Sequence, residues 1–340
     1  MDKQIDGKHN YNLDLVKIFA CIAVVGLHTL QKDISLLNAL LYYACAFAVP
    51  AFFMSTGYIL LNRFDINKKY SVKKIRNILK IVLIWSLLLF GAKIFVAIIT
   101  KKNEFYILEF LKILVGSVVQ RGKLWQFWYL GALILVYMIL PILLKNRENL
   151  LKIWLVLVVI SVCVQMVSYI IGQPLQSYCI QTFRIWTWLQ YFILGGLIGK
   201  YNKEEFELKK MNFKKHTIIF FAFTILVVVY QNYIGKFVLY NSYAEYFYDS
   251  IITITWLIIL FTWIMNLTLS QRIINIIKYI VPATMGVYIV HPLIISIITR
   301  VILINTILKS FLFFVFIVFI SFVIVRIMYK IPILKELIKL

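Results

Sequence analysis

Residues Ile302 to Met328 read ILINTILKSFLFFVFIVFISFVIVRIM, and this stretch sets the class of the whole chain. From Ser310 to Val325 it carries no charged side chain. A helix needs about 20 predominantly apolar residues to cross the hydrocarbon of a bilayer. A continuous apolar run, unlike an alternating one, indicates a helix and not a strand of a membrane barrel. The stretch therefore predicts a transmembrane helix.

Comparable apolar runs recur along the whole chain of 340 residues. Hydrophobic residues make up 62% of it and charged residues 15%, whereas a soluble domain has about 45–50% and 25%. The excess apolar surface requires a lipid partner, so we predict an all-α polytopic transmembrane helix bundle of about ten spans. Residues 1–340 would form a single membrane domain, without an attached soluble domain. The other nine predicted spans are 13–30, 36–61, 78–99, 125–144, 151–171, 185–199, 217–234, 246–267 and 279–299.

The charge is strongly basic, with 36 Lys and Arg against 14 Asp and Glu. With the N-terminus inside, the loops on that side hold 22 basic residues and the outer loops hold 9. This asymmetry predicts that both termini are cytosolic, and the basic loops would face anionic lipid, with no nucleic-acid partner. Lys68 and Lys209 would then be cytosolic, and Asn103 and Tyr240 outside. The mixed pattern of residues 104–119 predicts an interfacial helix on the outer surface.

Three ionisable side chains lie in or beside the first span: Asp14, Lys17 and His28. Lys17 and His28 are about three helical turns apart and share a face, and Asp14 lies within ion-pair reach of Lys17. Such groups at membrane depth are costly unless they are paired or face water, which makes them functional candidates. A neutral imidazole is well suited to act as a general base. The alternative is a snorkelling Asp14–Lys17 pair and a packed, hydrogen-bonded His28.

The remaining histidines and cysteines give weaker signals. His9 and His216 lie in polar, basic surroundings, and we expect both to be exposed to solvent. The cysteines form no CxxC pair and no metal-ligand spacing, so we expect small buried apolar residues and no metal site. They are Cys21, Cys45, Cys163 and Cys179.

The first span also carries a recognisable pattern: Asp14, Lys17 and Ala20, then His28 eleven residues after Lys17. This resembles the opening helix of the acyltransferase family 3 membrane proteins, which reads Asp-x-x-Arg, then an alanine and a histidine at the same spacing. Lysine replaces arginine at Lys17, which keeps the charge but loses the bidentate fork.

Three further stretches resemble the same family, in the same order. VPAFFMSTGY at 49–58 is similar to its Phe-Phe-x-x-Ser-Gly-Tyr segment, with Thr56 in place of serine. QFWYL at 126–130 is similar to its His-x-Trp-Phe/Tyr-Leu stretch, with Gln126 in place of histidine. GVYIVHP at 286–292 is similar to its late Gly-x-Tyr-x-x-His segment. The resemblance therefore extends over most of the chain.

The resemblance implies a donor site and an acceptor site. Lys73, Lys74 and Arg76 stand near the family's Arg-x-x-Arg motif, in either of two registers, and would bind the phosphates of coenzyme A; the alternative is ordinary basic loop decoration. For the acceptor we expect an aromatic platform near the outer surface. For Trp125, Trp128 and Tyr129 the alternative is an interfacial anchor. His291 could equally be a structural histidine. The expected acceptor residues are Trp125, Trp128, Tyr129, Tyr288 and His291.

The resemblance implies that the chain is a membrane O-acyltransferase of the bacterial plasma membrane. Members of this family are most often O-acetyltransferases. It would move an acetyl group from cytosolic acetyl-CoA to a hydroxyl of an extracytoplasmic cell-surface polysaccharide or lipid-linked glycan, with an envelope-assembly partner or a second copy as further partners. His28 would be the general base or a transient acyl acceptor, beside Lys17 and Asp14. The alternatives are a transporter of an amino acid or a polysaccharide intermediate, and a glycan-binding accessory subunit.

Overall fold

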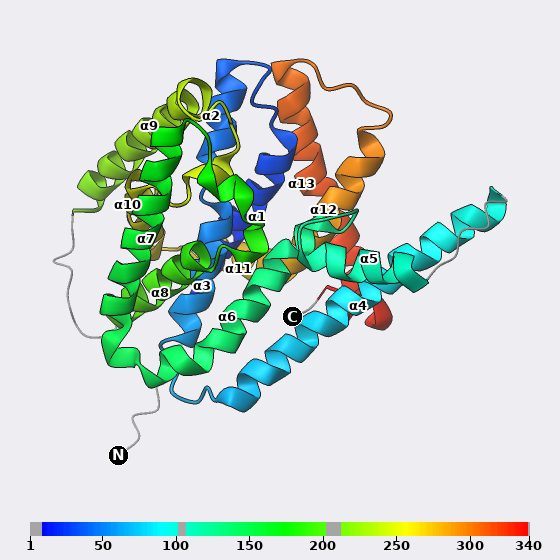
Figure 1. Ribbon diagram of the computed structural model, residues 1–340, viewed down its shortest axis with the longest axis horizontal. Coiled ribbons are helices and arrows are strands. Elements are labelled where there is room, and N and C mark those ends of the chain that lie inside the picture. Colours follow the sequence, from blue (N-terminus) through cyan, green and yellow to red (C-terminus); the bar gives the residue numbers. More distant parts are fainter. Residues whose placement is uncertain (1–8, 101–106, 202–211, 339–340) are drawn as a thin grey trace.

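The computed structural model describes residues 9–100, 107–201 and 212–338, and within these ranges every regular element is helical (Figure 1). The α-helices are α1 (Tyr11–Thr29), α2 (Leu36–Ala44), α3 (Ala48–Leu60), α4 (Lys68–Ile99), α5 (Ile107–Val118), α6 (Trp128–Lys145), α7 (Leu150–Ile171), α8 (Ile185–Tyr201), α9 (Phe213–Phe237), α10 (Ile251–Met265), α11 (Gln271–Ile280), α12 (Thr284–Ile298), α13 (Ile307–Lys330) and α14 (Pro332–Lys335).

The described chain contains eight stretches long and apolar enough to cross a bilayer, and each coincides with a predicted span. The other two predicted spans, 185–199 and 246–267, correspond to the shorter helices α8 and α10, of 17 and 15 residues. At 1.5 Å per residue these helices measure about 26 and 23 Å, which is less than the roughly 30 Å of hydrocarbon. The all-α polytopic bundle is confirmed, and the count of ten spans stays a prediction.

The predicted span 36–61 is not one continuous helix, because α2 ends at Ala44 and α3 begins at Ala48. Pro50 explains the break: it has no N–H to donate to the carbonyl of Ala46, and its ring would clash with that carbonyl in a continuous helix. In the first turn of α3, by contrast, a missing N–H costs nothing.

The predicted span 246–267 also begins later than expected. Ser250 caps α10 by accepting a hydrogen bond from the Thr253 N–H, so the helix begins at Ile251. Before it lies the short 3₁₀ helix η5 (Ala244–Phe247), whose first and last residues are buried in protein. Non-helical backbone is tolerated at membrane depth where protein surrounds it. This irregular segment contributes directly to the site described below.

Helices α3 and α8 pack in backbone contact, through glycines. A Cβ atom added at Gly57 would lie 2.6 Å from the carbonyl carbon of Phe192, and one added at Gly195 would lie 2.6 Å from Cα of Met54. Real Cβ atoms do not approach other atoms so closely. Small residues are the usual means of close packing between membrane helices, because van der Waals contact drives their association.

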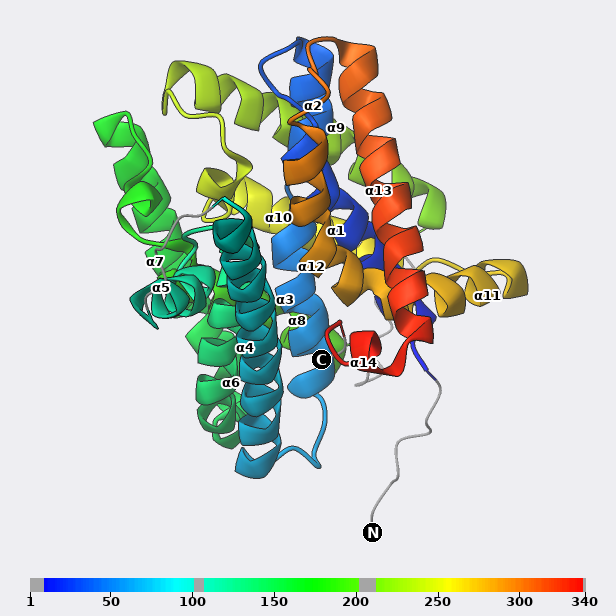
Figure 2. The same cartoon turned by 90° about the vertical axis from the view of Figure 1, so that its right-hand side faces the viewer.

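Helix α1 packs against α3, α10, α12 and α13, and the two views show it in the interior of the bundle (Figures 1 and 2). Helix α4 lies against α5 and α6, and its far end projects beyond the other helices (Figure 1). The expected helix in 104–119 is present as α5, although residues 104–106 lie outside the described ranges. The structure thus buries the one helix that carries Asp14, Lys17 and His28.

The predicted orientation can be tested at two exposed positions, Lys68 and Tyr240. In a background with Cys163, the exposed native cysteine, replaced by serine, we expect an impermeant maleimide on intact cells to label Tyr240→Cys but not Lys68→Cys. The physical reason is the excess of basic residues on one side. Labelling of Lys68→Cys from outside would contradict the predicted orientation. Asn103 and Lys209 lie outside the described residues.

Candidate active site

The first of two polar cavities beside α1 is lined by three lysines from distant parts of the chain. Lys17 of α1, Lys74 of α4 and Lys335 of α14 border a volume of about 580 Å³. Tyrosine side chains, among them Tyr129 and Tyr288, complete its wall. We call it the lysine cavity. Three ammonium groups around one hollow make it suitable for an anionic ligand.

Lys17 is held by the predicted ion pair, which is confirmed: its Nζ lies 3.0 Å from Oδ1 of Asp14. Asp14 is only 3% exposed, and its second oxygen bonds the ring of His9. His9 is exposed as expected. His216 is not: it is 5% exposed, because it lies in the first turn of α9, where it bonds the backbone of Ile259 in α10.

Of the three residues expected to bind the cofactor, only Lys74 reaches the lysine cavity. Lys73 and Arg76 are exposed on other sides of α4. Successive residues of an α-helix are 100° apart, so a helix cannot turn 73, 74 and 76 toward one cavity. Of the expected set only Lys74 therefore lines the lysine cavity, together with Lys17 and Lys335, and a contact of Lys73 and Arg76 with coenzyme A stays a prediction.

The second cavity, of about 230 Å³, is lined by His28, Trp125 and Trp128. We call it the histidine cavity. His28 is exposed and lines this cavity, and its ring forms a T-shaped pair with that of Trp125, with ring centres 4.8 Å apart. Tyr129, by contrast, lines the lysine cavity. Trp128 and Tyr129 are 6% and 7% exposed, so the alternative of interfacial anchors facing lipid is wrong for these two.

His291 lines neither cavity but contacts His28. Its ring stacks on that of His28, with centres 5.5 Å apart. Its Nδ1 lies 2.9 Å from the carbonyl oxygen of Val287, and its buried Nε2 has no partner among the described residues. The imidazole of His28 therefore contacts two rings, those of Trp125 and His291, and its side chain lines the histidine cavity.

Tyr288 is the wall between the two cavities, because it lines both. Its hydroxyl donates a hydrogen bond to the backbone oxygen of Gln126, and the edge of its ring meets Tyr129 with centres 5.5 Å apart. Both tyrosines were expected at the acceptor site. The structure instead divides that set, with Trp125 and Trp128 on one side of Tyr288 and Tyr129 on the other.

Two residues of the cavities carried little sequence signal. Lys335 lies near the C-terminal end, in α14. Glu245 lines the histidine cavity from η5. The only sequence feature that could have pointed to it is the scarcity of acidic residues, of which the chain has 14. Burial raises the pKa of the Glu245 carboxyl above its ordinary value, while the guanidinium of Arg184 acts to lower it.

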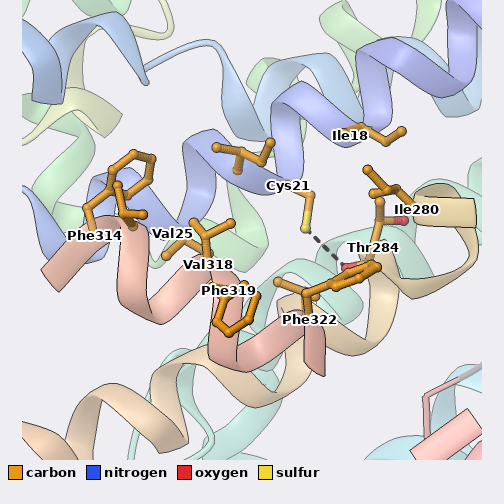
Figure 3. Close-up of a pocket in the computed structure, with 12 residues that line it drawn as sticks. Ile18, Cys21, Val25, Ile280, Thr284, Phe314, Val318, Phe319 and Phe322 are labelled. Atoms are coloured by element: carbon orange, nitrogen blue, oxygen red, sulfur yellow. Dashed lines mark hydrogen bonds between the residues drawn. The ribbon is translucent and has the colours of Figure 1, made fainter. Parts of the chain in front are cut away.

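A third hollow lies between α1, α12 and α13 and differs in kind (Figure 3). Apolar side chains line it, among them Val25, Phe314 and Phe319, the last of which is 64% exposed. The dashed line in Figure 3 is the hydrogen bond from Cys21 Sγ to the backbone oxygen of Thr284, at 3.3 Å. Because no Asp, Glu, Lys, Arg or His lines it, this groove suits hydrocarbon and not group transfer.

Comparison with known proteins gives two similarities. A family model described as an acyltransferase domain matches residues 10–326. A curated protein of Enterococcus faecalis named amino-acid racemase is 26% identical over 349 aligned residues, which cover 94% of this chain and 46% of that protein. The chain thus spans about half the length of this curated relative. No solved structure matches this chain.

Proposed function

Since the chain belongs to the acyltransferase family 3 of membrane proteins, we propose that it transfers an acetyl group from cytosolic acetyl-CoA to a hydroxyl of an extracytoplasmic polysaccharide or lipid-linked glycan in the plasma membrane. One observation carries the proposal: α1 presents Lys17 to the lysine cavity and His28 to the histidine cavity. Eleven residues separate them, about 16 Å along the helix. A single helix thus connects a cationic hollow with an imidazole beyond a tyrosine wall.

The lysine cavity is the proposed donor site. The ammonium groups of Lys17, Lys74 and Lys335 would form charge-assisted hydrogen bonds to the phosphates of coenzyme A. The predicted orientation puts this cavity on the cytosolic side, where the donor is found. Rotation of the Tyr288 side chain away from Gln126 would then join the two cavities and let the thioester approach His28.

At His28, two chemical routes remain open. As a general base, the imidazole takes the proton of the acceptor hydroxyl while the hydroxyl oxygen attacks the thioester carbonyl. The C–S bond then breaks, and the coenzyme A thiolate leaves and recovers the proton from the imidazolium. As a nucleophile, the imidazole takes the acetyl group itself before the hydroxyl does. Both routes need the ring of His28 open to the cavity and positioned by its neighbours.

The donor site can be tested by comparing two adjacent lysines. We expect Lys74→Gln to raise the KM for acetyl-CoA about tenfold, because a hydrogen bond from a charged group to a phosphate is lost. Lys73→Gln is the matched control: it removes the same charge from an exposed neighbouring position and should leave KM unchanged. Equal effects of the two substitutions would argue for general charge attraction and against a site in the lysine cavity.

The acceptor side can be tested on cells. Analysis of surface glycans for ester-linked acetyl groups, with and without this protein, should show groups that depend on it. Re-expression of the wild-type chain should restore them, and re-expression of His28→Gln should not. Glycans with identical acetyl content in all four samples would contradict the proposal.

Passage of a small polar solute is a second candidate function, and its support is the pair of polar cavities beside α1. Two polar cavities that meet at Tyr288 would also suit a conduction path for an amino acid. Transport does not require an imidazole base, whereas acyl transfer by the proposed routes does. Uptake of radiolabelled amino acids into proteoliposomes, unchanged by His28→Gln, would favour this candidate.

A further inference from the structure

The histidine cavity has a charged wall that the proposed chemistry at His28 does not use. Glu245 enters it from η5 and is the only described lining residue with a formal charge at neutral pH, His28 being taken as neutral. Its side chain keeps 22% of its surface exposed. A carboxylate with accessible surface in a hollow otherwise lined by aromatic, amide and aliphatic side chains is available to a ligand.

Arg184 supports this carboxylate from the protein side. Its guanidinium lies 3.4 Å from Oε1 of Glu245 and donates at 3.0 Å to the backbone oxygen of Cys179. The Arg184 side chain is only 4% exposed and does not line the cavity. A ligand in the cavity would therefore meet the carboxylate and not the guanidinium.

We propose that Glu245 binds the acceptor, by accepting a hydrogen bond from a second hydroxyl or an ammonium group next to the hydroxyl that His28 activates. The reacting unit of the acceptor is then a neutral sugar or an amino sugar, and not a uronic acid or a phosphorylated sugar. Arg184 is a positioning residue that holds the carboxylate in place. This inference rests on the proposed acyl transfer, and it adds the chemical class of the acceptor.

Two physical effects give this selectivity. A hydrogen bond to a charged oxygen is stronger than one between neutral groups, so a hydroxyl-rich ligand gains affinity at Glu245. A ligand carboxylate or phosphate at the same place would meet a like charge, which weakens its binding. The rings of Trp125 and Trp128 in the same cavity offer apolar faces against which a sugar ring can pack.

The test uses the purified protein in nanodiscs, radiolabelled acetyl-CoA and two probe acceptors with the same ring. Methyl glucoside is neutral, and methyl glucuronide differs from it by one carboxylate. We expect the wild-type protein to acetylate the glucoside with at least about tenfold higher kcat/KM than the glucuronide. Equal use of both probes would overturn the inference.

The variants then assign this preference to residues. Glu245→Gln should raise the KM for the glucoside about tenfold with little change in kcat. It should also narrow the difference in kcat/KM between the glucoside and the glucuronide. Arg184→Gln should shift KM in the same direction, and Arg184→Lys should restore part of it. Asp33→Asn removes a negative charge from a side chain 86% exposed and outside the cavity, and should change neither value.

Three outcomes separate the inference from the function on which it rests. Unchanged KM and probe preference in Glu245→Gln would overturn the role of Glu245 alone. Acetyl-CoA binding, measured by a shift in thermal unfolding, without transfer to either probe would overturn the acceptor class. Absence of acetyl-CoA binding in the wild-type protein would overturn the proposed function itself. The same unfolding measurement shows whether each variant is folded.

Discussion

His28→Gln is expected to lower acetyl transfer at least about a hundredfold, the usual contribution of general acid–base catalysis. Glutamine approaches imidazole in size and hydrogen-bonding capacity but cannot accept a proton near neutral pH. The ring of His28 is open to its cavity and contacts the rings of Trp125 and His291, so the loss would be chemical and not structural. Initial rates of radiolabel transfer from acetyl-CoA, measured with purified protein, give the value.

Two measurements make this result decisive. Acetyl-CoA binding should persist in His28→Gln, because the proposed donor site is the lysine cavity, which His28 does not line. His216→Gln is the matched control: this buried histidine of α9 lines neither polar cavity, so transfer should remain near normal. A folded His28→Gln protein with near-normal transfer would remove His28 from the mechanism and strengthen the transport candidate.

Gly57→Ala and Gly195→Ala are each expected to destabilise the protein by about 1–3 kcal/mol or more, as overpacked substitutions do. The added methyl group would meet backbone atoms of the facing helix, and backbone cannot move aside as a flexible side chain can. Helices α3 and α8 would have to separate. We expect lower yields of monodisperse protein and a lower midpoint of thermal unfolding, measured by fluorescence-detected size exclusion.

Gly91→Ala is the control for the intrinsic effect of the substitution. A Cβ atom at Gly91 would meet nothing within 4 Å, and alanine favours a helix over glycine by about 1 kcal/mol. This variant of α4 should therefore be as stable as the wild type or slightly more so. If all three variants unfolded at the same temperature, the close packing of α3 on α8 would not contribute to stability.

Features that depend on neighbours in the sequence could be predicted without the structure. Hydropathy summed over about 20 residues reports the free energy of inserting a helix in lipid, and eight predicted spans overlap helical stretches long and apolar enough to cross a bilayer. The Asp14–Lys17 ion pair follows from helical spacing alone. The break before Pro50 also has a local cause, because proline has no N–H and its ring clashes with the carbonyl four residues earlier.

Only the tertiary structure decided which residues share a cavity. Glu245 lies beside His28 in one hollow, and Lys335 joins Lys17 in the other, across most of the length of the chain. It also decided that Lys74 and not Lys73 reaches the lysine cavity. The reason is that lipid tails are as apolar as a protein interior. Hydropathy therefore cannot tell which face of a helix meets lipid and which meets another helix, and that choice is made by backbone fit, as at Gly57 and Gly195.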